Sequence, residues 1–279
     1  MGEFKAAVFS KGIAASSSLL FFLILATANW FFEILKWQTL VSAFEKTPFK
    51  TALKQSLASL TVSLATPNRI GEYGAKALFF EKKMRKKILL LNFFSSISQM
   101  FVTSFFGLFG LLYLFQNFNI PYSVTTLCYF GIGVILFLAV TYYFKEKELL
   151  MKGFSMAKMM RFFRSIPLQV KFKTMLFSTF RYLIFSGMFY GMLLFFGAKI
   201  SFTVAIPLIF AMYLLVSVLP TLFIFDVVIR GGVAVWLFSF VGIPELTVLS
   251  TVLTMWLLNF VLPALFGSFF VLTYQPITR

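Results

Sequence analysis

Residues 66–76 read TPNRIGEYGAK and interrupt an otherwise apolar chain with a proline, an acid and a base. Pro67 ends a helix because it lacks an N–H and its ring clashes with the preceding turn. Glu72 and Lys76 follow on one helix face, four residues apart, where they can pair. A charge in hydrocarbon costs roughly 2.5–3.5 kcal/mol, so it persists only with a partner or in a wet cavity. We predict a helix–break–helix hairpin that carries a functional site.

A second stretch, residues 219–230 (LPTLFIFDVVIR), has a similar order. Pro220 breaks the helix, and Asp226 and Arg230 share one face of the helix that follows. Gly231 and Gly232 come next and allow close approach of another backbone, or bending. In both stretches a purely structural ion pair is the alternative to a binding site.

The composition predicts a polytopic, all-α integral membrane protein whose residues 1–279 form a single transmembrane domain. The chain is 60% hydrophobic and 12% charged, and several apolar runs reach the roughly 20 residues that span a bilayer. It has no histidine and one cysteine, Cys128, which removes the usual general base, the usual zinc ligand and a thiolate cluster. We therefore expect no enzyme activity, no metal and no cofactor.

The net charge of +16 follows the membrane topology. Most Lys and Arg residues lie in three basic loops, residues 46–54, 82–87 and 145–173, between apolar runs. Basic loops face the cytoplasm, so the charge needs no nucleic-acid partner to explain it. The N-terminus then falls outside and the C-terminus inside, and the basic start hints at a preceding span. Residues 153–173 mix methionines, phenylalanines and cations, which is typical of a helix on anionic headgroups.

The topology predicts two inverted repeats, each with a broken, re-entrant-like helix hairpin. Repeat 1 covers about residues 13–116, a linking span and basic loop cover 122–173, and repeat 2 covers 174–274. Transporters built from inverted repeats place their substrate near the bilayer midplane, at broken helices.

Three further groups of polar residues stand in apolar segments. Arg181 is expected to pair with Asp226 or Glu72, or to line a headgroup path. Asn259, near Pro263, either faces a cavity or forms an interhelical hydrogen bond. The third group is best explained as interfacial anchoring beside two tryptophans, and consists of Asn29, Glu33 and Lys36.

Residues 64–73, LATPNRIGEY, resemble the signature of the flippase-like family, the transmembrane region of lysylphosphatidylglycerol synthase and its stand-alone relatives. Weaker similarity extends to residues 29–37, 219–232 and 256–267, and so over most of the chain. The resemblance implies movement of a lipid between leaflets, without the soluble domain that makes that lipid in the fused synthases. Asp226 departs from the family pattern, because many relatives carry Glu after glycine there.

The sequence thus favours a lipid translocator of a prokaryotic cytoplasmic (inner) membrane. Its partners would be membrane lipids, either an anionic phospholipid or a polyprenyl-phosphate lipid. The alternatives are an ion-coupled transporter of a small anionic solute and a non-catalytic partner subunit, and homo-oligomerisation stays open. The expected substrate-binding residues are Arg69, Glu72, Lys76, Arg181, Asp226, Arg230 and Asn259, and the expected structural breaks are Pro67, Gly71, Pro220, Gly231 and Gly232.

Overall fold

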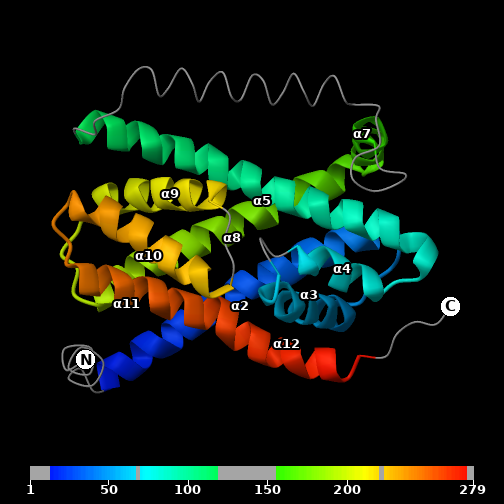
Figure 1. The fold of residues 1–279 in the computed structure, drawn as a ribbon, viewed down its shortest axis with the longest axis horizontal. Helices are drawn as coiled ribbons and strands as arrows, with labels where there is room; N and C mark the ends of the chain where they lie inside the picture. The colour runs from blue at the N-terminus through cyan, green and yellow to red at the C-terminus, as the bar shows by residue number, and fades with distance from the viewer. Residues whose placement is uncertain (1–12, 67–69, 119–154, 220–222, 275–279) are drawn as a thin grey trace.

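The computed structural model describes residues 13–66, 70–118, 155–219 and 223–274, and in these segments the chain is built from helices (Figure 1). The elements are α2 (Ile13–Ser42), α3 (Phe49–Leu64), α4 (Gly71–Leu78), α5 (Lys82–Asn117), α7 (Met156–Ser165), α8 (Leu168–Phe195), α9 (Phe202–Val218), α10 (Phe223–Ser239), α11 (Glu245–Trp256), the π-helical turn η2 (Leu257–Val261) and α12 (Leu262–Leu272).

Within the described ranges, three helical segments are long and apolar enough to cross a membrane: Ser17–Ser42, Lys82–Asn117 and Glu245–Leu272. The last of these joins α11, η2 and α12. The chain is therefore an all-α integral membrane protein, as the composition predicts. The span predicted at residues 122–144 lies outside the described residues.

Prolines and glycines set several helix boundaries. Pro48, Pro167 and Pro244 directly precede α3, α8 and α11, where the first turn needs no N–H from them. Gly197 and Gly242 follow α8 and α10 with φ of +91° and +69°. This left-handed conformation lets the next N–H reach back to a carbonyl of the last turn, and glycine adopts it without steric cost.

Both predicted helix breaks fall where the sequence places them. α3 ends at Leu64 and α4 begins at Gly71, while α9 ends at Val218 and α10 begins at Phe223. The Gly71 N–H donates to Thr66 Oγ1 at 2.8 Å, and a Cβ on Gly71 would lie 2.8 Å from the same oxygen. The first break therefore requires glycine there. Pro67 and Pro220 lie outside the described residues.

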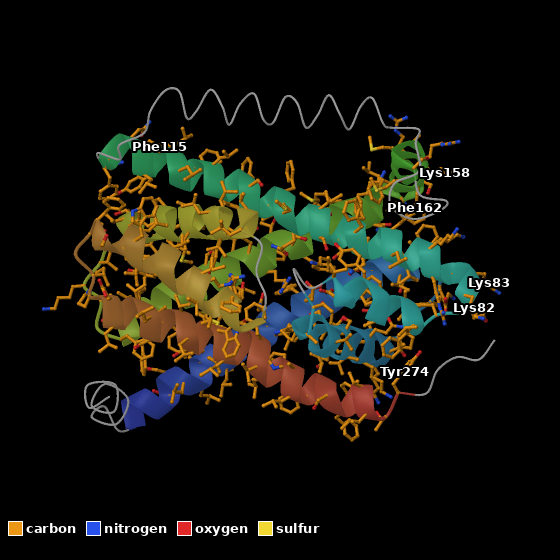
Figure 2. All side chains as sticks on the ribbon, viewed as in Figure 1. Lys82, Lys83, Phe115, Lys158, Phe162 and Tyr274 are labelled. Carbon is orange, nitrogen blue, oxygen red and sulfur yellow. The ribbon has the colours of Figure 1, made fainter. Side chains whose placement is uncertain are left out.

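The two broken pairs occupy opposite ends of the molecule (Figures 1 and 2). α3 and α4 lie at the end that carries Lys82, Lys83 and Lys158, and α9 and α10 lie toward the end that carries Phe115. The most extensive helix interfaces join α5 to α9, α2 to α8, and α3 to α12.

Two basic segments differ from the prediction: residues 82–87 were expected to be a loop, and residues 153–173 were expected to be one helix. Residues 82–87 form the first turns of α5 rather than a loop. With 36 residues, α5 is roughly 54 Å long, so its basic turns can project beyond a 30 Å hydrocarbon layer. Residues 153–173 are not one helix, because α7 ends at Ser165 and Pro167 precedes a new helix.

α7 presents two different faces. Phe162 stacks on Phe44, and Phe163 on Phe93, so its aromatic side chains pack against protein. Lys158 and two arginines of the helix are exposed instead. α7 therefore turns a cationic face outward at the basic end of the molecule.

Two glycines of α5 create a close helix seam with α9. A Cβ on Gly110 would run into the Pro207 carbonyl oxygen and the Ala211 nitrogen of α9, and one on Gly107 would meet Leu214. The close packing of α5 on α9 therefore depends on glycine at these two positions. A Cβ on Gly187, in α8, would meet nothing within 4 Å, so helix packing does not require glycine at that position.

We expect Gly110→Ala to lower the free energy of unfolding by about 1–3 kcal/mol, because the methyl group would push α9 backbone away from α5. Gly187→Ala should leave stability unchanged or raise it by up to about 1 kcal/mol, since alanine has the higher helix propensity. Thermal unfolding of both variants in one detergent measures the difference. Equal melting temperatures would contradict the seam.

Candidate functional site

In the first hairpin, the ammonium group of Lys76 already has several partners within the protein. Lys76 Nζ lies 2.6 Å from Glu72 Oε1 and donates to Asn92 Oδ1 at 2.9 Å, and it sits 4.3 Å from the centre of the Trp37 ring. Lys76 is only 1% exposed. These contacts tie α4 to α5 and α2, which favours the structural alternative for Glu72 and Lys76.

A second buried cluster centres on Glu33. Its Oε2 accepts from Arg181 Nη1 at 2.6 Å and from Lys36 Nζ at 2.8 Å. Arg181 thus pairs with Glu33 of α2, and the expected pairing with Asp226 or Glu72 was wrong. The sequence spacing could not show that α8 packs along α2.

The expected anchoring of Asn29, Glu33 and Lys36 at the membrane surface was also wrong. All three are less than 9% exposed and lie inside the helical body. Trp37, taken as an interfacial ring, is fully buried and donates its indole N–H to Gln55 Oε1 at 2.8 Å. The polar face of α2 therefore points inward.

The π turn η2 brings Asn259 against α2. Pro263 has no N–H to offer the carbonyl four residues earlier, which is that of Asn259. This carbonyl instead accepts the Trp30 indole N–H at 2.9 Å, and the Asn259 side-chain oxygen accepts from Asn29 Nδ2 at 2.9 Å. Both alternatives for Asn259 thus hold, because it bonds between helices and also faces a cavity.

That cavity, the arginine cavity, has a volume of about 230 Å³ and lies among α2, α5, α8, α9, α10 and η2. Gln99 and Arg181 stand about halfway along α5 and α8, so it lies at mid-depth of the helices. Its polar lining consists of Asn29, Gln99, Thr103, Arg181, Tyr182, Tyr213, Ser217, Arg230 and Asn259.

The charges around this cavity are unequal. Arg230 Nε donates to Asp226 Oδ2 at 2.9 Å, and its guanidinium carbon lies 5.8 Å from the Phe260 ring. Among the described residues, the ion pairs at the cavity and directly behind it contain three cations, Lys36, Arg181 and Arg230, and two carboxylates, Glu33 and Asp226. Excess positive charge at this depth is costly, so an anion in the cavity would be stabilised.

Several buried side-chain donors and acceptors around the cavity have no hydrogen-bond partner among the described residues. Arg181 Nε, Gln99 Oε1 and Asn29 Oδ1 are buried and have no hydrogen-bond partner within the described structure. A buried donor or acceptor without a partner costs about 1–3 kcal/mol. Arginine offers a planar fork of five N–H donors that matches phosphate and carboxylate oxygens. The arrangement is suited to a polar, anionic ligand.

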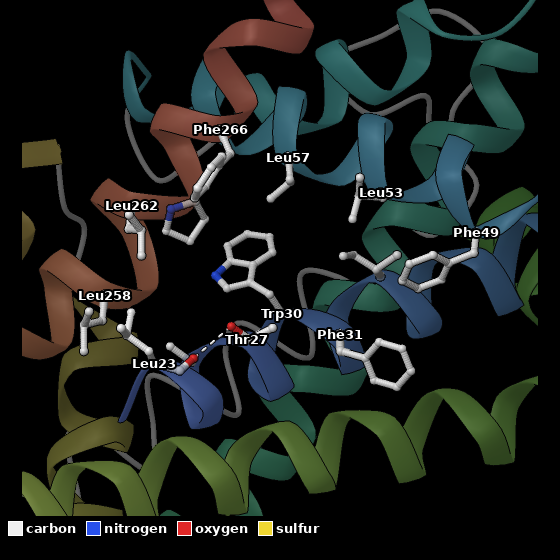
Figure 3. Close-up of a pocket in the computed structure, with 13 residues that line it drawn as sticks. Leu23, Thr27, Trp30, Phe31, Phe49, Leu53, Leu57, Leu258, Leu262 and Phe266 are labelled. Atoms are coloured by element: carbon white, nitrogen blue, oxygen red, sulfur yellow. Dashed lines mark hydrogen bonds between the residues drawn. The ribbon is translucent and has the colours of Figure 1, made fainter. Parts of the chain in front are cut away.

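An apolar groove lies on the other side of Trp30 (Figure 3). It has a volume of about 380 Å³ and is formed by side chains of α2, α3, η2 and α12. Among its described lining residues the one hydroxyl, that of Thr27, donates to the Leu23 carbonyl at 2.8 Å, within α2. The groove therefore offers mainly hydrocarbon contacts.

The structure brings together Arg181, Arg230 and Asn259 of the residues predicted to bind substrate. Asp226 lies behind Arg230 as its partner, whereas Glu72 and Lys76 form the separate pair on α4. Arg69 lies outside the described residues. Sequence reasoning missed Gln99, although the polar run of residues 95–99 inside an apolar span was a usable signal.

α10 runs without interruption through Gly231 and Gly232, so the structural break expected at these glycines is not present, and no second backbone of the described residues approaches them. A Cβ on Gly231 would meet only the Leu249 side chain, at 3.0 Å, and one on Gly232 would meet nothing within 4 Å. Across the described ranges, no three His, Cys, Asp or Glu side chains lie together as metal ligands would.

No protein-family model, curated protein or solved structure matches this chain.

We expect Lys76→Met to lower the free energy of unfolding by about 3 kcal/mol, because it strands Glu72 and Asn92 in a mostly buried position. Lys83→Met removes a lysine from an exposed pair with Glu81 and should cost less than about 1 kcal/mol. Chemical denaturation in detergent measures both. The double variant Glu72→Gln/Lys76→Met should recover stability; no recovery would argue against a pairwise structural role.

Proposed function

We propose that this protein moves a lipid with an anionic headgroup between the leaflets of a prokaryotic inner membrane. The observation that carries the proposal is the arginine cavity, in which Arg181 and Arg230 face one space at mid-depth of membrane-spanning helices. The headgroup phosphate would lie between the two guanidinium groups, with Gln99 and Asn29 accepting from headgroup hydroxyl or amino groups. The phosphate offsets the excess positive charge of the lining.

The arrangement of the broken helices supports this proposal. The α3–α4 and α9–α10 pairs lie toward opposite ends of the molecule, as inverted repeats over residues 13–116 and 174–274 would place them. Inverted repeats allow the same substrate site to open to either side in turn. The similarity of residues 64–73 to the flippase-like family points to the same class of cargo.

The basic end supports an orientation for the proposed carrier. Exposed lysines of α5 and cations of α7 gather at the end that holds α3 and α4 (Figure 2). Cytoplasmic membrane surfaces are anionic and attract such residues. The first hairpin would then face the cytoplasm and the second the opposite side.

We expect Arg230→Gln to reduce lipid translocation at least tenfold in liposomes, because one cation of the cavity is lost. Arg230→Lys should keep part of the rate, since it retains charge without the planar fork. Fluorescent phosphatidylglycerol in the liposomes, bleached from outside by dithionite, measures the rate.

Arg161→Gln is the matched control, because it removes an arginine from the exposed face of α7. Equal rates for Arg161→Gln and Arg230→Gln would overturn the assignment of the cavity. Uptake of radiolabelled inorganic phosphate into the same liposomes, without lipid movement, would instead identify a transporter of small anions.

A further inference from the structure

The arginine cavity and the apolar groove share one wall. Asn29 lines the cavity and Trp30 lines the groove, and likewise Asn259 faces the cavity and Leu258 the groove. The two spaces are thus separated by neighbouring residues of α2 and η2. Trp30 marks the boundary, because the Arg181 guanidinium carbon lies 6.0 Å from its ring.

Two side-chain hydrogen bonds link α2 to η2 across this wall. The Asn29 amide donates to the Asn259 side chain, and the Trp30 indole donates to the Asn259 carbonyl. Both bonds end on the π turn, whose backbone departs from regular helical bonding.

The chemistry of the two spaces is complementary. The cavity presents guanidinium and amide groups, whereas the groove presents aliphatic and aromatic side chains with its hydroxyl already bonded. A single ligand that filled both would carry an anion at one end and hydrocarbon at the other. A membrane lipid has this composition, and α2, η2 and α12, which line the groove, belong to segments long and apolar enough to cross a membrane.

We infer that the apolar groove binds a hydrocarbon chain of the same lipid whose headgroup enters the arginine cavity. This inference rests on the proposed function and extends it from the headgroup to the whole lipid. Trp30 and Asn259 then lie at the junction between headgroup and chain. The groove keeps the chain in apolar contact while the polar end is held away from the lipid phase.

Filling the groove tests this assignment. Thr27→Trp places an indole at an exposed position whose side chain points into the groove (Figure 3). Leu20→Trp is the matched control, because Leu20 lies two turns earlier on the same stripe of α2, is 60% exposed and does not line the groove. The probes are dioleoyl phosphatidylglycerol, counted as retained lipid by native mass spectrometry, and glycerophosphoglycerol, the headgroup alone, measured by calorimetry.

We expect Thr27→Trp to weaken dioleoyl lipid retention at least tenfold while headgroup affinity stays unchanged. Leu20→Trp should resemble the parent protein with both probes. Equal lipid retention by the two variants would overturn the inference. A change in oligomeric mass for Thr27→Trp at unchanged lipid retention would also overturn it, and would assign the groove to a second copy of the chain.

Photo-crosslinking of the unaltered protein keeps the test valid if Thr27→Trp does not fold. Phosphatidylglycerol with a diazirine in its acyl chain should label groove peptides of α2, α3 and α12, and excess unlabelled lipid should suppress the adducts. Labelling spread evenly over lipid-facing helices, without competition, would overturn the inference. Arg230→Gln separates the two proposals. Unchanged headgroup affinity in that variant would contradict the assignment of the arginine cavity as the headgroup site, whereas the result for chain binding in the groove would still hold.

Discussion

Pairing of charges inside an apolar helical body is the constraint on which the rest of this structure depends. Glu33 accepts from both Lys36 and Arg181, and so joins α2 to α8. Lys76 is neutralised by Glu72 within α4 and joins α4 to α5 through Asn92. Because an unpaired charge is costly in this environment, the Glu33–Arg181 pair holds α8 against α2. The arginine cavity lies among the helices packed in this way, including α2, α5 and α8.

A proline in the last membrane-crossing segment supplies the second constraint. Pro263 cannot donate to the Asn259 carbonyl, and the backbone responds with a π turn over Leu257–Val261. The freed carbonyl is satisfied by Trp30 of α2. One missing N–H thereby fixes the contact between the first and last described spans, and with it the wall between a polar and an apolar space.

The sequence predicted the helices well because their signals are local. Apolar length, proline positions and glycines were enough to locate the spans and both breaks. Partners across the fold were not predictable, because a helix face carries no information on which helix it meets. Arg181 therefore received the wrong partner, and Asn29, Glu33 and Lys36 were placed at the surface although their spacing already showed a continuous polar face.

Spare hydrogen-bonding capacity distinguishes a structural charge from one that can bind a ligand. Lys76 has an acid, an amide and an aromatic ring around its ammonium group, so nothing remains for a substrate. Arg181 shares Glu33 with Lys36, and its buried Nε has no partner among the described residues. The same holds for one side-chain oxygen each of Gln99 and Asn29, which line the same cavity. A fold stabilised only by its own pairs would leave no such donors and acceptors together. Their convergence on one cavity at mid-depth is the reason that we propose a ligand there, and an anion would complete them.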